Sequence, residues 1–242
     1  MTGNTTEAAN GTDWVARLVE LMHQLRAPGG CPWDREQTHA SLKEYLVEES
    51  AELFDAIDDK DDKAIIEELG DVLLQVVFHC EIAAADRRFD LQTAARSCCE
   101  KLIRRHPHVF GNTEVHDAQG VLRQWEEIKK EEKGAERPSV ISGVPRHLPA
   151  LHRAHKMQKK AAKVGFDWPT TDGVLAKIDE ELAEVRKALL QGDEAAVREE
   201  IGDLLFAVVN LSRFQKHVAE ELLHNTVLKF ERRFIRMEQL LR

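Results

Sequence analysis

The stretch EESAELFDAIDDKDDKAIIEELGD, residues 48–71, decides how the chain folds, because its acidic pattern occurs a second time. The second copy is EELAEVRKALLQGDEAAVREEIGD, residues 180–203. The pattern Glu-Glu-x-x-Glu, followed by Glu-Glu-x-Gly-Asp, is displaced by 132 residues between the copies. Comparing residues 48–79 with residues 180–211 without a gap gives 14 identities in 32 positions. The chain therefore contains a duplicated unit.

Each copy has the spacing of two antiparallel helices joined by a short turn. Residues three apart on a helix share a face, and each copy carries two such acidic pairs. Across the first copy, residues 52 and 68 are centred on Lys60, and so are residues 49 and 71. In the second copy, 184 and 200, and 181 and 203, are centred on Gly192, a residue suited to a chain reversal. Folding at these centres brings four carboxylates together in each hairpin: Glu49, Glu52, Glu68 and Asp71 in the first, and Glu181, Glu184, Glu200 and Asp203 in the second.

These two quartets are the candidate metal ligands of the chain. Clustered carboxylates repel one another unless a cation neutralises them. Oxygen-only ligands suit Mg²⁺ or Mn²⁺, which keep positions open for water and phosphate oxygens. A single acidic pair at this spacing is common on any solvated helix. The repetition of the whole quartet at one offset favours metal binding over that structural alternative.

Composition predicts an all-α protein built from two related four-helix-type modules. Ala, Leu, Glu, Lys and Arg dominate segments of 3.6-residue periodicity, and the formal net charge of −9 argues against a sequence-independent nucleic-acid binder. No run of residues reaches the length of a membrane span. The polar N-terminus lacks the features of a secretory signal, and Cys31, Cys80, Cys98 and Cys99 form no C-x-x-C pair, as expected of reduced thiols in a cytoplasmic protein.

The domain organisation follows from helix periodicity and from Pro and Gly punctuation. We expect a disordered tail over residues 1–12, a helical domain over 13–133, a linker over 134–149 and a second helical domain over 150–242. Asp13 is the expected N-cap of the first helix, Ser41 and Glu44 form an expected capping box, and Asp172 is a further expected cap. Loops are expected around residues 31–34 and 107–112.

Apolar runs follow both quartets, at residues 72–78 and 204–209. A helix that is apolar on most sides must be buried from several directions. We therefore expect these runs to form bundle cores that a partner subunit completes, in an intertwined homodimer.

The acidic pattern, with a Gly before its final Asp, resembles that of the MazG family of nucleoside triphosphate pyrophosphohydrolases. The resemblance covers residues 13–240, in the two-domain form of the family. It extends to CPWD at 31–34, RHPHVF at 105–110, VGFDW at 164–168 and KFERRF at 229–234. It implies an all-α, dimeric enzyme of nucleotide-pool housekeeping, which uses Mg²⁺ to hydrolyse nucleoside triphosphates to monophosphates and pyrophosphate by attack of water at the α-phosphate.

The resemblance also implies roles for individual residues. The second quartet would hold the catalytic metal, and Lys177, Lys229 and Arg233 would contact the triphosphate, with Glu180 beside them. Cationic donors next to metal ions suit this task, because they hold phosphate oxygens that the metals leave free.

Other interpretations of these features stay open. Trp33 and Trp168 each precede an acidic helix and could either stack on a base or seal a core. A nucleotide- or partner-binding regulatory module with weak or lost turnover is the alternative function. A carboxylate-bridged di-iron bundle is disfavoured, because neither quartet supplies the Glu-x-x-His pairs of such sites.

Overall fold

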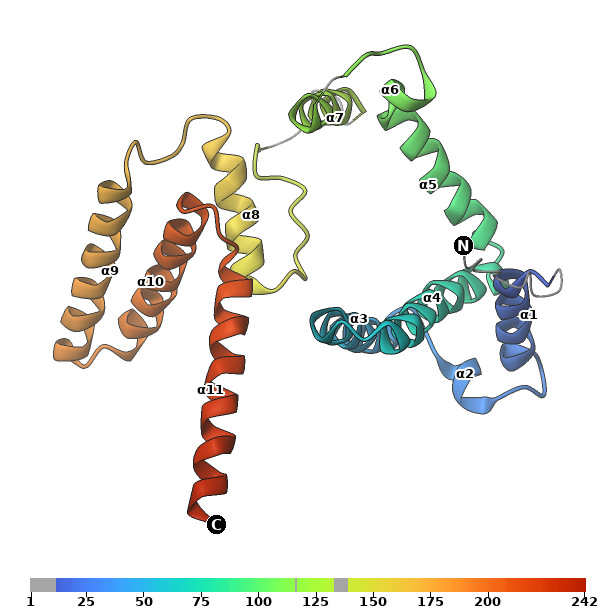
Figure 1. The fold of residues 1–242 in the computed structure, drawn as a ribbon, viewed down its shortest axis with the longest axis horizontal. Helices are drawn as coiled ribbons and strands as arrows, with labels where there is room; N and C mark the ends of the chain where they lie inside the picture. Colours follow the sequence, from blue (N-terminus) through green and yellow to red (C-terminus); the bar gives the residue numbers. More distant parts are fainter. Residues whose placement is uncertain (1–11, 116, 133–138) are drawn as a thin grey trace, which may run out of the picture. The chain divides into compact units, whose positions relative to one another are not determined.

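The computed structural model describes residues 12–115, 117–132 and 139–242, and in those ranges every regular element is an α-helix (Figure 1). The expectation of an all-α protein is confirmed. The chain divides into two compact units, residues 1–128 and 129–242. The expected tail, apart from residue 12, and the first part of the expected linker lie outside the described residues, so the domain boundaries stay predictions.

The first unit is built around a long helical hairpin. Its helices are α1 (Trp14–Arg26), α2 (Pro32–Glu36), α3 (Leu42–Asp59), α4 (Asp62–Ala85), α5 (Leu91–Arg105) and α6 (Pro107–Phe110), and α7 (Ala118–Glu132) runs into the second unit. Helix α3 folds back on α4, and α1 packs against α4. The Asp13 carboxylate caps α1, as expected, by accepting from the backbone N–H groups of the next turn. Buried side chains from these three helices form the core: Met22, Leu42, Val77, Phe78 and Ile82.

The second unit repeats this hairpin. Its helices are α8 (Ala150–Ala162), α9 (Thr171–Gln191), α10 (Glu194–Phe214) and α11 (Ala219–Leu241). Helix α9 pairs with α10, α8 packs on α10, and α11 contacts α8 and α10 near its start and then extends beyond them (Figure 1). Its buried apolar side chains include Val174, Val185, Ala188, Ala207 and Val209.

The two hairpin turns have the same backbone conformation at the expected centres. Lys60 and Gly192 both adopt the left-handed region, at φ 56° and 66°. The next residue is an extended Asp in each turn, and its carboxylate accepts two backbone N–H groups of the following helix. Because both hairpins have the same turn conformation and the same Asp cap, their acidic residues lie at the same number of residues from the turn.

Several local expectations were wrong. Ser41 has helical backbone angles and makes no cap bond to Glu44. The reciprocal box begins three residues earlier: Thr38 N–H donates to Ser41 Oγ (2.9 Å) and Ser41 N–H donates to Thr38 Oγ1 (3.1 Å). Asp172 lies inside the first turn of α9, where its charge favours the helix start without capping it. The expected loops at 31–34 and 107–112 each contain a short helix that begins at a proline, α2 and α6.

The apolar runs after the quartets are only partly covered within one chain. Val77 and Phe78 are buried but Val76 is exposed, and Ala207 and Val209 are buried but Leu205 is exposed. No helix in the described part of the chain is both long enough and apolar enough to cross a membrane.

Candidate metal centre and its cavity

The second hairpin brings three carboxylates of its quartet together. Helix α9 contributes Glu181 and Glu184, one turn apart, and α10 contributes Glu200. One oxygen from each lies within 4.8 Å of the others. Glu181 is buried, with only 5% of its surface exposed. The fourth predicted ligand, Asp203, is not in this group and lines a cavity with Glu181.

The charges of this cluster are not balanced by the protein alone. Burial raises the pKa of Glu200, and the neighbouring charges of Glu184 and Glu181 raise it further. The ammonium of Lys177 lies 2.6 Å from Glu181 Oε1 and 2.9 Å from Glu180 Oε1. Hydrogen bonds to these carboxylates, first to that of Glu181, raise the pKa of Lys177. One lysine thus faces several carboxylates, a donor set that fits a hard divalent cation.

A cavity of about 900 Å³ lies beside the cluster. Lys177, Glu181 and Asp203 line it, as do apolar side chains of which Val164, Phe166 and Phe206 are examples. Trp168 also lines it, and its ring lies directly over Gly173, where a Cβ atom would approach the ring to 2.9 Å. The volume is typical of small-molecule sites.

Three polar side chains that are joined by hydrogen bonds form part of the cavity wall: Asp167, Arg213 and Asn210. Arg213 donates to both carboxylate oxygens of Asp167, at 3.0 and 2.5 Å, and to Asn210 Oδ1, at 3.1 and 2.7 Å. The Arg213 hydrogen bond lowers the pKa of Asp167. On helix α8, Gln158 is buried and donates from Nε2 to the carbonyl oxygen of Phe206 (2.9 Å).

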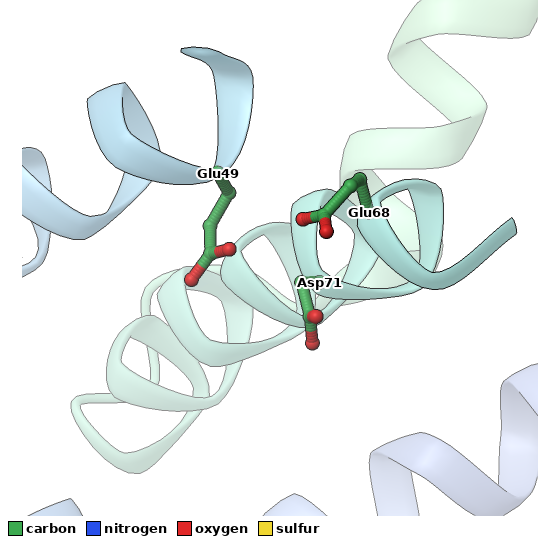
Figure 2. Close-up of side chains that lie close together, drawn as sticks. All are labelled: Glu49, Glu68 and Asp71. Carbon is green, nitrogen blue, oxygen red and sulfur yellow. The ribbon is translucent and has the colours of Figure 1, made fainter. Parts of the chain in front are cut away.

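The first hairpin forms a similar carboxylate cluster. Figure 2 shows Glu49 on α3 facing Glu68 and Asp71 on α4, with one oxygen from each within 4.8 Å of the others. Burial raises the pKa values of Glu49 and Glu68, and nearby carboxylates, including that of Glu52, raise them further. Glu52 itself lies outside the group.

The two units differ in the residues that surround their clusters. At the offset of 132, Lys177 and Asn210 are replaced by Tyr45 and Phe78. Trp33 packs edge-on against both rings, with centroid distances of 5.6 and 6.4 Å. Two positions that carry polar side chains at the cavity of the second unit are thus occupied by aromatic side chains in the first. Trp33 contacts these two rings while 49% of its surface is exposed, and Trp168 lines a cavity.

The structure does not bring every predicted site residue to the cavity. Lys229 and Arg233 are exposed on α11 and do not line the cavity. Within the described residues, the hydrogen-bond partner of Glu180 is Lys177. Conversely, Gln158, Asn210 and Arg213 were not predicted. A signal existed for Asn210, since a core phenylalanine stands at the matching position of the first unit.

Comparison with known proteins identifies the family. The sequence model described as the MazG nucleotide pyrophosphohydrolase domain matches residues 37–110 and 170–235, more than half of the chain. The chain belongs to the MazG family. The two matched segments of this MazG chain contain both carboxylate clusters.

Named relatives resemble the MazG chain over most of its length. It is 49% identical to a nucleoside triphosphate pyrophosphohydrolase/pyrophosphatase MazG of Thermotoga maritima, over 93% of this chain and 85% of the relative. It is 45% identical to a nucleoside triphosphate pyrophosphohydrolase of Escherichia coli K12, over 93% of this chain and 88% of the relative. A crystal structure of a mazG-related protein from Thermotoga maritima aligns with 47% of this chain and 97% of its own, at 29% identity and a TM-score of 0.41.

Proposed function

We propose that the second unit hydrolyses nucleoside triphosphates to nucleoside monophosphates and pyrophosphate with the help of Mg²⁺. The observation that carries the proposal is the Glu181, Glu184 and Glu200 cluster at the edge of a cavity of about 900 Å³. Family membership and the names of the relatives support it. Mn²⁺ has the same ligand preference and would be expected to substitute.

The side chains present fit a magnesium ion. Glu181, Glu184, Glu200 and Asp203 would hold it. Burial and the neighbouring carboxylates raise the pKa of Glu200, so its negative charge is unfavourable there, and a bound divalent cation would remove that penalty. When bound, such an ion supplies charge stabilisation for phosphate oxygens and activates water.

The protein's own groups position the substrate. Lys177 contacts Glu181 and lines the cavity, where its ammonium can donate to a phosphate oxygen while the base occupies the apolar space. Trp168 provides an aromatic face in that space. The family resemblance assigns Lys229 and Arg233 to the triphosphate, although neither lines the cavity. Water would attack the α-phosphorus, and pyrophosphate would leave with the electrons of the broken bond.

A matched pair of variants tests this assignment. With a panel of triphosphates and Mg²⁺, the wild-type chain should release pyrophosphate and monophosphate. Glu200→Gln should lower kcat by about 10²–10³-fold, the effect of losing a major electrostatic contact in an active site. Glu68→Gln, the same exchange at the matching position of the first unit, should leave kcat within about twofold of wild type, since substitutions outside the reacting site remove no transition-state contact.

The products and the two variants separate the alternatives. Release of orthophosphate alone would contradict attack at the α-phosphorus. Equal losses in both variants would contradict assignment to the second unit. Tight nucleotide binding without any product would favour the binding-module function.

A further inference from the structure

A β-turn ahead of helix α8 carries apolar side chains where turns usually carry polar ones. The Ser142 N–H group donates to the carbonyl oxygen of Ser139 (3.0 Å), and the Ile141 N–H group donates to Ser139 Oγ (3.4 Å). The two central residues of this turn are therefore Val140 and Ile141. Glycine, proline, asparagine, aspartate and serine dominate such positions. Val140 is 50% exposed, and both side chains line the cavity of the second unit.

The side chain of Lys160 attaches this turn to helix α8. Its ammonium donates to the carbonyl oxygen of Ser142 at 2.5 Å, although the two residues are 18 positions apart in the sequence. Lys160 lies in the last turn of α8 and is not one of the residues that line the cavity. It can therefore affect the cavity through the turn that it holds.

The segment that follows α8 brings further apolar side chains to the same end of the helix. Val164 comes four residues after Lys160, and Gly165, at φ 85°, then turns the chain away from the helix. Phe166 is 82% exposed, yet it lines the cavity together with Val164 and the turn. Two segments that are distant in sequence thus meet at the C-terminal end of α8 and give the cavity apolar walls.

Helix α9 indicates which way a nucleotide would lie in the cavity. The ring of Trp168 lies over Gly173, Lys177 follows one helical turn later, and Glu181 follows one turn after that. At 1.5 Å per residue, Gly173 and Glu181 are about 12 Å apart along the helix. Lys177 and Glu181 are the groups that can meet phosphate and metal. An aromatic base is therefore best accommodated toward Trp168, which follows Phe166 by two residues.

We propose that the turn of residues 139–142 is the wall against which the nucleobase packs, and that Lys160 is a positioning residue that holds this wall in place. The inference rests on the proposed nucleotide function of the second unit. The side chains of Val140 and Ile141 have no hydrogen-bonding groups, so they make apolar contact with the ring and not with phosphate. The turn thus contributes binding energy from a part of the substrate that does not react.

Equilibrium binding of probes with and without a base tests the inference. The probes are α,β-methylene-ATP and inorganic tripolyphosphate, each titrated in a calorimeter with Mg²⁺. A double variant, Val140→Thr with Ile141→Thr, keeps β-branched side chains and makes them polar. It should bind α,β-methylene-ATP about tenfold more weakly, because apolar contact is lost. Its affinity for tripolyphosphate should stay within about twofold of wild type, because that probe has no base.

A second, independent variant is Lys160→Met, which keeps the length of the side chain and removes the donor to Ser142. It should bind α,β-methylene-ATP several-fold more weakly. With a hydrolysable triphosphate, KM should rise while kcat stays within about twofold of wild type, because a contact made equally in the ground state and the transition state affects KM alone. Lys160→Arg, which retains a donor, should restore both values. The control is Lys159→Met, the same loss of charge at an exposed neighbour on α8, which should behave as wild type.

Each outcome bears on the inference. If the double variant weakens both probes equally, or neither, the inference is overturned. A turn that instead contacts a second copy of the chain would change the mass of the double variant in light scattering and leave its affinity for α,β-methylene-ATP unchanged, which would also overturn it. The expected binding pattern without pyrophosphate release would leave the inference standing and refute the proposed reaction.

Discussion

Arg213 performs two tasks with one planar group, because a guanidinium offers five donors in a fixed geometry. It pairs with Asp167, which precedes Trp168 in the loop between α8 and α9, and it holds Asn210 on its own helix. The side chain of Arg213 is 11% exposed and that of Asp167 is 26% exposed, so solvent weakens their pairing only in part. The ion pair therefore links the loop that carries Trp168 to the helix that carries the polar wall.

Asp167→Asn should lower the free energy of unfolding by about 1–2 kcal/mol at pH 7, since a charge-assisted pair becomes a neutral one. The folded pKa of Asp167 lies below its ordinary value of 3.8. The stabilisation is thus fully present above pH 3.8 and is lost as the pH falls through the folded pKa. The difference between wild type and variant, measured by urea unfolding, should be constant near neutrality and vanish in strong acid. Asp179→Asn, at an exposed position of α9, is the control. A difference that grows on acidification would contradict this account.

At the scale of elements, the two hairpin turns are a matched pair with different residues at the left-handed position. Lys60 adopts φ 56°, a region that residues with a Cβ atom rarely occupy, and Gly192 adopts φ 66° without that cost. Lys60→Gly should therefore stabilise the chain by about 0.5–1 kcal/mol, and Gly192→Ala should destabilise it by about 1 kcal/mol.

Steric clash does not contribute to the effect of Gly192→Ala, because a Cβ atom at this position would have no neighbour within 4 Å. Chemical denaturation of the two variants against wild type measures both values. Changes of the same sign in both variants would show that the backbone conformation is not the cause.

The sequence predicted those elements whose signal is local or periodic. The hairpin centres followed from the spacing of the acidic pairs, and Asp13 followed from its place before an apolar stripe. The box at Thr38 and Ser41 was missed because Ser stands in it where the usual pattern has Glu or Gln, whereas Ser41-x-x-Glu44 matches that pattern. Gln158, Asn210 and Arg213 were missed because their roles depend on contacts between two helices and a loop, which no spacing along one helix encodes.

At the scale of the whole molecule, we expect the two carboxylate clusters to make the stability of the chain depend on divalent cations. A cation that binds only the folded chain raises its melting temperature, by an amount equivalent to about 2.7 kcal/mol at a hundred times Kd. The pKa values of Glu49, Glu68 and Glu200 are raised above the ordinary 4.5. Without metal, each of these groups therefore costs stability as the pH rises above 4.5.

We expect 5 mM Mg²⁺ to raise the melting temperature by several degrees relative to EDTA at pH 7.5, because the cation relieves that cost. Protons compete for the same oxygens, so the shift should shrink as the pH approaches 4.5. Differential scanning calorimetry across this range measures it. A chain with Glu68→Gln and Glu200→Gln should show a smaller shift, and a melting temperature indifferent to Mg²⁺ at pH 7.5 would refute both sites.

The exposed apolar side chains of the hairpins support a homodimer. Leu205, Phe206 and Val208 are between 43% and 53% exposed on the single chain, although they lie beside the buried core of α10. Light scattering after size exclusion should give a mass near twice 27.5 kDa. Leu205→Glu should shift the population toward the monomer, because a charge at a buried apolar contact is strongly unfavourable. A monomeric wild type at micromolar concentration would contradict the proposal.

Tyr45 is the single tyrosine of the chain, and it stands one turn before Glu49 where the second unit has Lys177. This tyrosine gives the first unit an optical label of its own. A change in tyrosine absorbance, or in excitation transfer from Tyr45 to the adjacent Trp33, would report events at the first carboxylate cluster. Events near Trp168 would change tryptophan emission without that tyrosine signal. Two clusters of nearly identical chemistry can therefore be titrated separately in the unmodified protein.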